Sequence, residues 1–333
     1  MRLLLSCLSC VIISFLLLPD IIAAQNLTLY SGRSKALVEP VVDRFEEQTG
    51  INVQVRYGSS TQLSLALMEE GSRTPADLFW AQDAGALGAV HAEGILEELP
   101  NDLLAKVPEQ FRSKYGTWVG TSGRARVIAF STSRTEKNEL PGGIQELTDE
   151  KWAGRVGWAP ANASFQAFLT AFRASEGEDT ARQWLEAMKD NRAQNYTNNN
   201  ALIQAISAGE IDLAITNHYY LFRYLDSNPD YPVDQTYFDE GDPGNFINVA
   251  GIGVISDSRN KEAAVEFTSF LLQESSQNYF IDEIFEYPVI NGLEFNPDET
   301  TIEDIRENTL RLDLDELEDL DATLTLLREV GLL

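Results

Sequence analysis

The segment that decides the fold is LTLYSGRSKALVEPVVDRFEEQTGINVQVRYG, residues 27–58. Its start has the apolar, β-favouring character of a strand, its middle carries apolar residues at helical spacing as far as Gly50, and its end alternates like a second strand. A helical pattern over 61–71 and a third strand pattern over 76–81 follow. Strands that alternate with helices predict a mostly parallel sheet, so we expect an α/β fold.

The same alternation returns in the second half of the chain and predicts a second α/β lobe. Strand patterns at 155–160 and 211–216 enclose three helical stretches. Two extended segments, 118–131 and 248–256, suit a chain that crosses to the second lobe and then returns. Two such crossings would form a hinge.

These patterns predict how the chain is divided. An export signal occupies residues 1–24, the first lobe consists of 25–125 plus 251–333, and the second lobe consists of 126–250. The composition turns strongly acidic after Pro297, and we expect a solvated helical tail there that packs on the surface of a lobe.

Residues 1–24 have the features of a removable signal peptide. A positive start precedes an apolar run over 3–18, and small residues at 23–24 offer a cleavage site. No later stretch approaches the roughly 20 uninterrupted apolar residues that a membrane helix needs. We therefore expect a mature chain from about Gln25 that lies in the periplasm and has no membrane span once the signal is removed.

Charge and cysteine content narrow the class of protein. The formal net charge is -27 at pH 7, so nucleic acid is not an expected partner, and self-repulsion favours a monomer. The two cysteines, Cys7 and Cys10, lie inside the signal. The mature chain therefore has no disulfide and no thiol that could bind a metal.

Four segments resemble the periplasmic ferric-ion-binding proteins, also called bacterial transferrins. They are DRFEEQTGINVQVRYG (43–58), TPADLFWAQDA (74–84), WVGTSGRARV (118–127) and ITNHYYLFRYL (215–225). The resemblance spans nearly the whole mature chain. It implies a two-lobed, periplasmic-binding-protein-like fold of type II with a hinge and an interlobe cleft, capture of ferric iron, and delivery to the permease of an ABC importer.

Tyr219 and Tyr220 match the paired tyrosines that bind Fe(3+) in that family. Ferric iron is a hard cation that favours anionic oxygen, and its charge can remove the proton of a phenol whose free pKa is about 10. Adjacent side chains diverge on a strand or a helix, so both reach one ion only where the backbone is irregular or just entering a helix. Asn217 is a suitable cap for such a helix. Without the family context, the pair would be read as one core residue and one surface aromatic.

The resemblance also implies an anion on the metal, such as carbonate, phosphate or citrate. Helix N-termini and small polar groups favour negative charge. By position, the anion-binding residues of the family match Asn162, Ala163, Ser164, Asn199, Asn217 and Arg124. Two alternatives stay open, since the asparagines and Ser164 could simply cap helices, and Arg124 could tie the lobes together with Arg126.

The chain departs from the family pattern at three positions. Many relatives have a histidine ligand after the first strand and a glutamate ligand after the third, where this chain has Ser34 and Gln82. Asp83 could substitute as a carboxylate donor, although a one-residue offset in an extended segment reverses the side chain. Phe165 stands where other branches have a tyrosine. A bound iron would therefore need several donors from an accompanying anion or chelator.

Two other functions compete with iron transport. An organic solute such as an amine, or an anion, could bind without iron in an aromatic cleft formed by Trp80, Trp158 and the tyrosine pair. An enzyme is the second alternative, but the mature sequence has no Gly-rich phosphate loop, GxSxG elbow, histidine cluster or cysteine nucleophile. We therefore do not expect catalysis.

Overall fold

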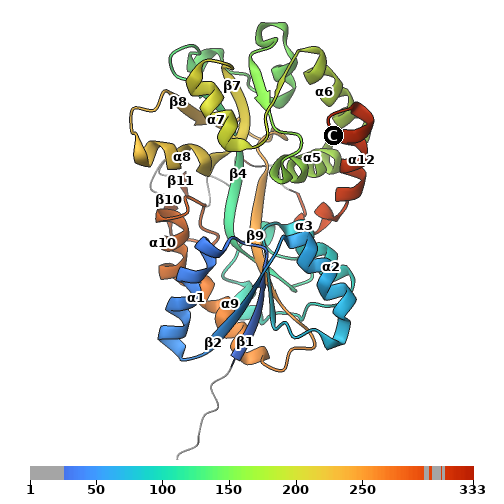
Figure 1. Cartoon of the computed structure of the whole chain (residues 1–333), viewed down its shortest axis with the longest axis vertical. Coiled ribbons are helices and arrows are strands. Elements are labelled where there is room, and N and C mark those ends of the chain that lie inside the picture. The colour runs from blue at the N-terminus through green and yellow to red at the C-terminus, as the bar shows by residue number, and fades with distance from the viewer. Residues whose placement is uncertain (1–25, 296–299, 302–308, 310–311) are drawn as a thin grey trace, which may run out of the picture.

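The computed structural model shows an α/β protein with two lobes that share one long sheet (Figure 1). It describes residues 26–295, 300–301, 309 and 312–333. The export signal that we expect over residues 1–24 lies outside this part of the chain. Among the helices that the structure describes, none is long and apolar enough to cross a membrane.

The main sheet has parallel ends and an antiparallel centre. Its strands are β1 (Asn26–Ser31), β2 (Asn52–Tyr57), β3 (Leu78–Ala81), β4 (Val119–Ser131), β5 (Val156–Trp158), β6 (Gln194–Asn195), β7 (Leu213–Asn217), β8 (Val233–Thr236) and β9 (Ile247–Val254). They are ordered β2-β1-β3-β9-β4-β7-β5-β6, with β8 paired to β4. β1 runs parallel to β2 and β3, and β5 runs parallel to β6 and β7, whereas β4 and β9 run antiparallel to their neighbours. A short hairpin, β10 (Glu294–Phe295) with β11 (Thr300–Thr301), is separate.

Strands β4 and β9 connect the two lobes. The first half of β4, residues 119–125, pairs with β9, and its second half pairs with β7 and β8. Figure 1 shows the two strands running side by side from one lobe to the other. They coincide with the two crossing segments expected from the sequence, and the hinge prediction is confirmed.

Helices pack on the sheet in both lobes (Figure 1). The first lobe carries α1 (Lys35–Thr49), α2 (Ser60–Glu70), α3 (Ala84–Ala92), the short α4 (Asn101–Leu104), α9 (Lys261–Leu271) and α10 (Glu274–Asp282). The second lobe carries α5 (Ala163–Glu176), α6 (Glu178–Asp190), α7 (Asn199–Ala208) and α8 (His218–Ser227). The helix that was expected to stop at Gly50 does so, because this residue adopts a left-handed φ of 73° that glycine tolerates without strain.

The end of the chain bridges the two lobes on one side. The 3-10 turn η6 (Leu314–Glu318) packs on α3 so closely that a Cβ on Gly85 would lie 2.7 Å from the carbonyl oxygen of Leu317. Asp315 anchors this turn by accepting a hydrogen bond of 2.7 Å from the indole nitrogen of Trp118.

The last helix, α12 (Leu320–Val330), packs on α5 and α6 of the second lobe. The hydroxyl groups of Thr323 and Thr170 lie 2.7 Å apart there, and Leu327 is fully buried. The sequence pattern predicts that residues 251–333 belong to the first lobe. The final helix lies against the second lobe instead, because its apolar face completes the core around α5 and α6.

Candidate metal-binding site

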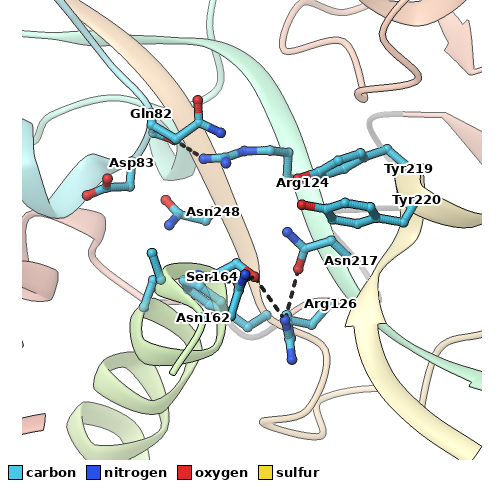
Figure 2. A pocket seen from close by; sticks show the side chains of 13 residues that line it. Gln82, Asp83, Arg124, Arg126, Asn162, Ser164, Asn217, Tyr219, Tyr220 and Asn248 are labelled. Atoms are coloured by element: carbon cyan, nitrogen blue, oxygen red, sulfur yellow. Dashed lines mark hydrogen bonds between the residues drawn. The ribbon is translucent and has the colours of Figure 1, made fainter. Parts of the chain in front are cut away.

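A cleft between the lobes gathers most of the candidate residues. Its cavity measures about 180 Å³ and is shown in Figure 2. Three of its walls are the junctions where a strand ends and a helix begins, namely β3 to α3, β5 to α5 and β7 to α8. Ligands of open α/β sheets bind at such carboxyl ends of strands. The strands β4 and β9 that connect the lobes form the floor, so the cavity lies between the two lobes.

Tyr219 and Tyr220 are the second and third residues of α8. Their rings stack with centroids 4.3 Å apart and an interplanar angle of 29°. Figure 2 shows both hydroxyl groups directed to the same side, into the cleft. The first turn of a helix thus brings two adjacent side chains together, as the sequence argument required. Two phenol oxygens are available to one ligand.

Burial keeps the phenol of Tyr219 in its protonated form when no metal is bound. Its side chain is 6% exposed. Burial raises the pKa of Tyr219, and the neighbouring Tyr220 raises it further, while Arg124 opposes the change. The guanidinium of Arg223 lies 4.9 Å from the ring centroid of Tyr219 and 5.8 Å from that of Tyr220. A cation of high charge is therefore needed to displace the protons.

A cluster of polar groups suited to an anion lies next to the tyrosines. Arg126 donates to Asn217 Oδ1 at 3.1 Å, to Ser164 Oγ at 3.4 Å and to the carbonyl oxygen of Ile215 at 3.1 Å. Burial lowers the pKa of Arg126 to about 9, so the group keeps its charge at neutral pH. Its Nε is buried without a hydrogen-bond partner. A buried cation with unused hydrogen-bonding capacity favours an anionic ligand.

The start of α5 adds a helix N-terminus to this cluster. Asn162 caps the helix, since its Oδ1 accepts hydrogen bonds from the backbone N–H of Ser164 at 3.0 Å and from its hydroxyl at 2.6 Å. Asn162, Ala163, Ser164 and Asn217 all line the cleft. Asn217 occupies the capping position of α8 but its side chain makes no capping bond and instead contacts Arg126. Helix capping and anion binding are therefore compatible roles for Asn162 and Ser164.

The hydrogen bond of Arg124 runs to the first lobe, so this bond does not tie the two lobes together. Arg124 lines the cleft, and its Nη2 donates to the carbonyl oxygen of Gln82. Its Nε is buried and unpaired. The residue thus ties hinge strand β4 to the loop after β3 while it presents positive charge beside the tyrosines (Figure 2).

Gln82 and Asp83 lie on the wall opposite the tyrosines. Asp83 caps α3 by accepting a hydrogen bond of 3.0 Å from the N–H of Ala86, and Figure 2 shows its carboxylate turned away from the two rings. Burial raises the pKa of Asp83, although its capping bond and Arg124 oppose the change. We expected the side chains of Gln82 and Asp83 to point in opposite directions, and their placement is consistent with that expectation. Neither side chain contacts Tyr219 or Tyr220 in this conformation.

Two candidates lie outside the cleft. Ser34 is exposed at the start of α1 and does not line the cavity. Asn199 is buried and donates to Ser164 Oγ at 3.1 Å, so it supports the anion cluster from behind instead of facing the ligand. Asn198 caps α7 in its place.

Sequence reasoning missed one residue and undervalued another. Asn248 lines the cleft from β9, and its Oδ1 accepts a hydrogen bond from the N–H of Ala84 at 3.3 Å. Arg126 was considered only as a lobe contact. The alternation along the hinge strand offered a signal, because Arg124 and Arg126 are two residues apart and must share one face of β4.

Behind the tyrosines lies a buried ion pair. Arg33 Nη2 is 2.8 Å from Glu286 Oε2, and both side chains are almost inaccessible. Burial would raise the pKa of Glu286, but Arg33, Arg124 and hydrogen bonds outweigh burial and lower it. Removing one partner of such a pair typically costs about 3–5 kcal/mol. Both charges act electrostatically on Tyr219.

His218 does not line the cleft. It is fully buried, its Nδ1 accepts a hydrogen bond from the N–H of Ala125 at 3.1 Å, and its ring stacks on Tyr287 at 4.0 Å. Burial lowers its pKa to about 3 from the ordinary 6.5. His91 lies apart from the cleft, with its Nδ1 3.1 Å from the hydroxyl of Thr117.

The neutral His218 predicts an acid-dependent loss of stability in the metal-free protein. The unfolded chain binds a proton at this residue below about pH 6.5 and the folded chain does not, so stability falls as the pH drops. The slope should approach about 1.4 kcal/mol per pH unit between pH 6 and 5. Urea unfolding of wild type and His218→Gln would measure it. Equal slopes in the two proteins would contradict the assignment.

The aromatic cleft of the rival function does not form. Trp80 and Trp158 are both 0% exposed, and neither lines the cavity. Trp80 donates to Thr121 Oγ1 at 2.9 Å, and Trp158 packs edge-on against Phe165. Phe165 itself is buried in the core of the second lobe. These rings point inward because they fill the space between sheet and helices.

The two lobes, the hinge strands and the charged cleft together define a two-lobed solute-binding protein. Residues 73–319 match the family of bacterial extracellular solute-binding proteins, and the chain belongs to that family. Among the residues that the structure describes, no group of three or more His, Cys, Asp or Glu side chains is placed to hold a metal ion.

Named relatives and solved structures agree with this class. The chain is 30% identical over 286 residues to the Fe(3+)-binding periplasmic protein of Serratia marcescens, in an alignment that covers 85% of this chain and 84% of the relative. The iron-bound HitA from Pseudomonas aeruginosa superposes with a TM-score of 0.83 at 30% identity, covering 92% of this chain and 99% of HitA. The Trichodesmium protein IdiA (FutA), solved with iron and citrate ligands, gives a TM-score of 0.81 at 28% identity, covering 92% and 99%.

Proposed function

We propose that this protein captures ferric iron in the interlobe cleft and delivers it to the permease of an ABC importer. The observation that carries the proposal is the stacked pair Tyr219 and Tyr220, whose hydroxyl groups face one cavity. Two phenolates neutralise much of the charge of Fe(3+), and hard oxygen donors suit this ion. The names of the Serratia and Pseudomonas proteins support the same cargo.

The ligand set would be completed by an anion or a chelator. Arg124, Arg126 and the N-terminus of α5 favour negative charge beside the tyrosines. Carbonate, phosphate and citrate are the candidates, and the Trichodesmium structure with iron and citrate supports this class. Asn162, Ala163, Ser164 and Asn217 would hold the anion, and Asn199 would support Ser164.

Lobe closure about β4 and β9 would bring the opposite wall onto the metal. The first lobe carries Gln82 and Asp83, so their approach to the tyrosines depends on this motion. We propose lobe boundaries near residues 125 and 250, with the final helix α12 added to the second lobe. Ser34 is the least suited of the candidate ligands, because it is exposed and lies outside the cavity.

The setting proposed for this activity is the periplasm. Removal of a signal over residues 1–24 would release the mature chain there, and the net charge favours a monomer. We propose a transport role without catalysis, which the solute-binding family supports.

The proposal is tested by titrating metal-free protein with ferric iron in the presence of citrate. Coordinated phenolate should produce a visible phenolate-to-iron charge-transfer band that saturates at one iron per chain. Addition of an amine without iron should not change the melting temperature. A titration that leaves the protein colourless, or stabilisation by the amine alone, would overturn iron capture.

A further inference from the structure

A second cavity lies beside the metal site, and the proposed function leaves it without a role. Its volume is about 390 Å³, which falls within the roughly 300–1,000 Å³ typical of small-molecule pockets. We call it the side chamber; its walls include Leu65, Met68, Ala89, Gln166, Leu317 and Leu320. They come from α2 and α3 of the first lobe, from α5 of the second, and from the chain end that bridges the lobes (Figure 1).

The side chamber borders the metal site. Asp83, Ala163, Ala167 and Asn248 line both cavities. Two of these residues are alanines of α5, so only small side chains stand between the two cavities on the α5 side. A ligand held at Tyr219 can therefore extend past the start of α5 into the chamber.

The chemistry of the side chamber differs from that of the metal site. The metal site contains Arg124 and Arg126, whereas no lysine or arginine occurs among the described residues that line the chamber. Its charged lining residues are the carboxylates Asp83 and Asp321. Leu65 is 54% exposed at its rim. These walls repel a polyanion and favour an uncharged, partly aliphatic group.

The coordination positions of the iron that the protein leaves unfilled suit a chelator with an uncharged, partly aliphatic body. Octahedral iron bound by two phenolates needs four further donors, and the opposite wall offers only Gln82 and Asp83. A hydroxamate supplies two oxygen donors for one negative charge and leaves no free carboxylate. Two hydroxamates joined by an aliphatic linker complete the shell and add an uncharged body.

We propose that the cargo is the ferric complex of a dihydroxamate-type chelator, with the aliphatic body of the chelator in the side chamber. This inference rests on the proposed function, since it assumes iron at the tyrosine pair. The chelator donors take the positions next to Arg124 and Arg126. The linker passes between Ala163 and Asp83 and packs against Ala89 and Leu317.

The experiment compares two tetradentate chelators. Metal-free protein is titrated with ferric iron in the presence of equimolar suberodihydroxamate, a linear aliphatic dihydroxamate, or nitrilotriacetate, a compact polycarboxylate. Absorbance gives the apparent Kd, and native mass spectrometry identifies the ternary complex. We expect a ternary complex with suberodihydroxamate that binds more tightly than the one with nitrilotriacetate.

Ala89→Leu tests the chamber itself, because Ala89 lines the chamber and not the metal site. Filling the cavity should raise the Kd of the dihydroxamate complex by at least about tenfold. A change of this size corresponds to the free-energy cost of modest overpacking. The nitrilotriacetate complex should change by less than about twofold. Ala92→Leu, the same change at an exposed position of the same helix, should leave both values unaltered.

The outcomes separate the two proposals. If nitrilotriacetate loads iron with the charge-transfer band and the dihydroxamate only removes iron from the protein, the chamber inference is wrong and iron capture stands. If Ala89→Leu weakens both complexes equally, the chamber does not contact the chelator and the inference is again wrong. If no ferric complex gives the band, iron capture itself fails.

Discussion

Replacing Tyr219 or Tyr220 by phenylalanine is expected to abolish tight ferric binding. Each change removes an anionic oxygen that would bond the metal directly. The loss should exceed the roughly 10–100-fold that removal of an outer-shell partner typically costs in metal affinity. The charge-transfer band should weaken and shift in either single variant and disappear in the double variant. Competition against citrate, followed by absorbance, measures both effects.

Tyr224→Phe provides the matched control for this experiment. Tyr224 lies on the same helix, α8, stacks on Tyr231 and accepts a hydrogen bond from Gln204 Nε2, away from the cleft. Its loss should leave the affinity and the colour unchanged. Wild-type affinity in the double variant, with circular dichroism showing an intact fold, would remove the tyrosines from the site.

The fold could be predicted from the sequence because its signals are local. The strand, helix, strand pattern of residues 27–58 follows from periodicity, and the two crossing segments follow from their apolar, extended character. The hinged two-lobed fold was implied by the family resemblance. The packing of α12 could not be predicted in this way. Its apolar face, which includes Leu327 and Val330, fits any complementary surface equally well, and only the folded chain shows that the turn at Asp315 directs it towards α5.

The site could be predicted only where a motif was present. Tyr219 and Tyr220 stand out as a pair at a predicted strand end, and the structure places both in the cleft. Asn248 belongs to no motif, because its place in the site arises from the antiparallel pairing of β9 with β4, where it lies opposite Arg124. Arg126 has only the weaker signal of strand alternation, and its strand partner is Asn217 of β7. The alternative function placed Trp80 and Trp158 in an aromatic cleft, and the structure places both in the core instead. Large aromatics at strand positions fill a core more often than they line a cleft.

Iron affinity is expected to fall steeply as the pH drops from 7 to 5. An ordinary phenol has a pKa of about 10, and burial raises that of Tyr219 above this value. Iron binding must therefore displace one proton from each tyrosine, and the apparent association constant should fall about 100-fold per pH unit. Competition with nitrilotriacetate, corrected for protonation of the chelator, would give this slope.

The other titratable groups of the site must be compared with the phenols as sources of this pH dependence. His218 has a pKa of about 3 and Arg126 a pKa of about 9, so neither changes charge between pH 7 and 5. Burial raises the pKa of Asp83, so this carboxyl can add proton uptake to the slope. Tyr219→Phe removes one of the two displaced protons and should lower the slope by about tenfold per pH unit. A wild-type slope of tenfold or less would mean that only one tyrosine ionises, and the two-phenolate site would have to be abandoned.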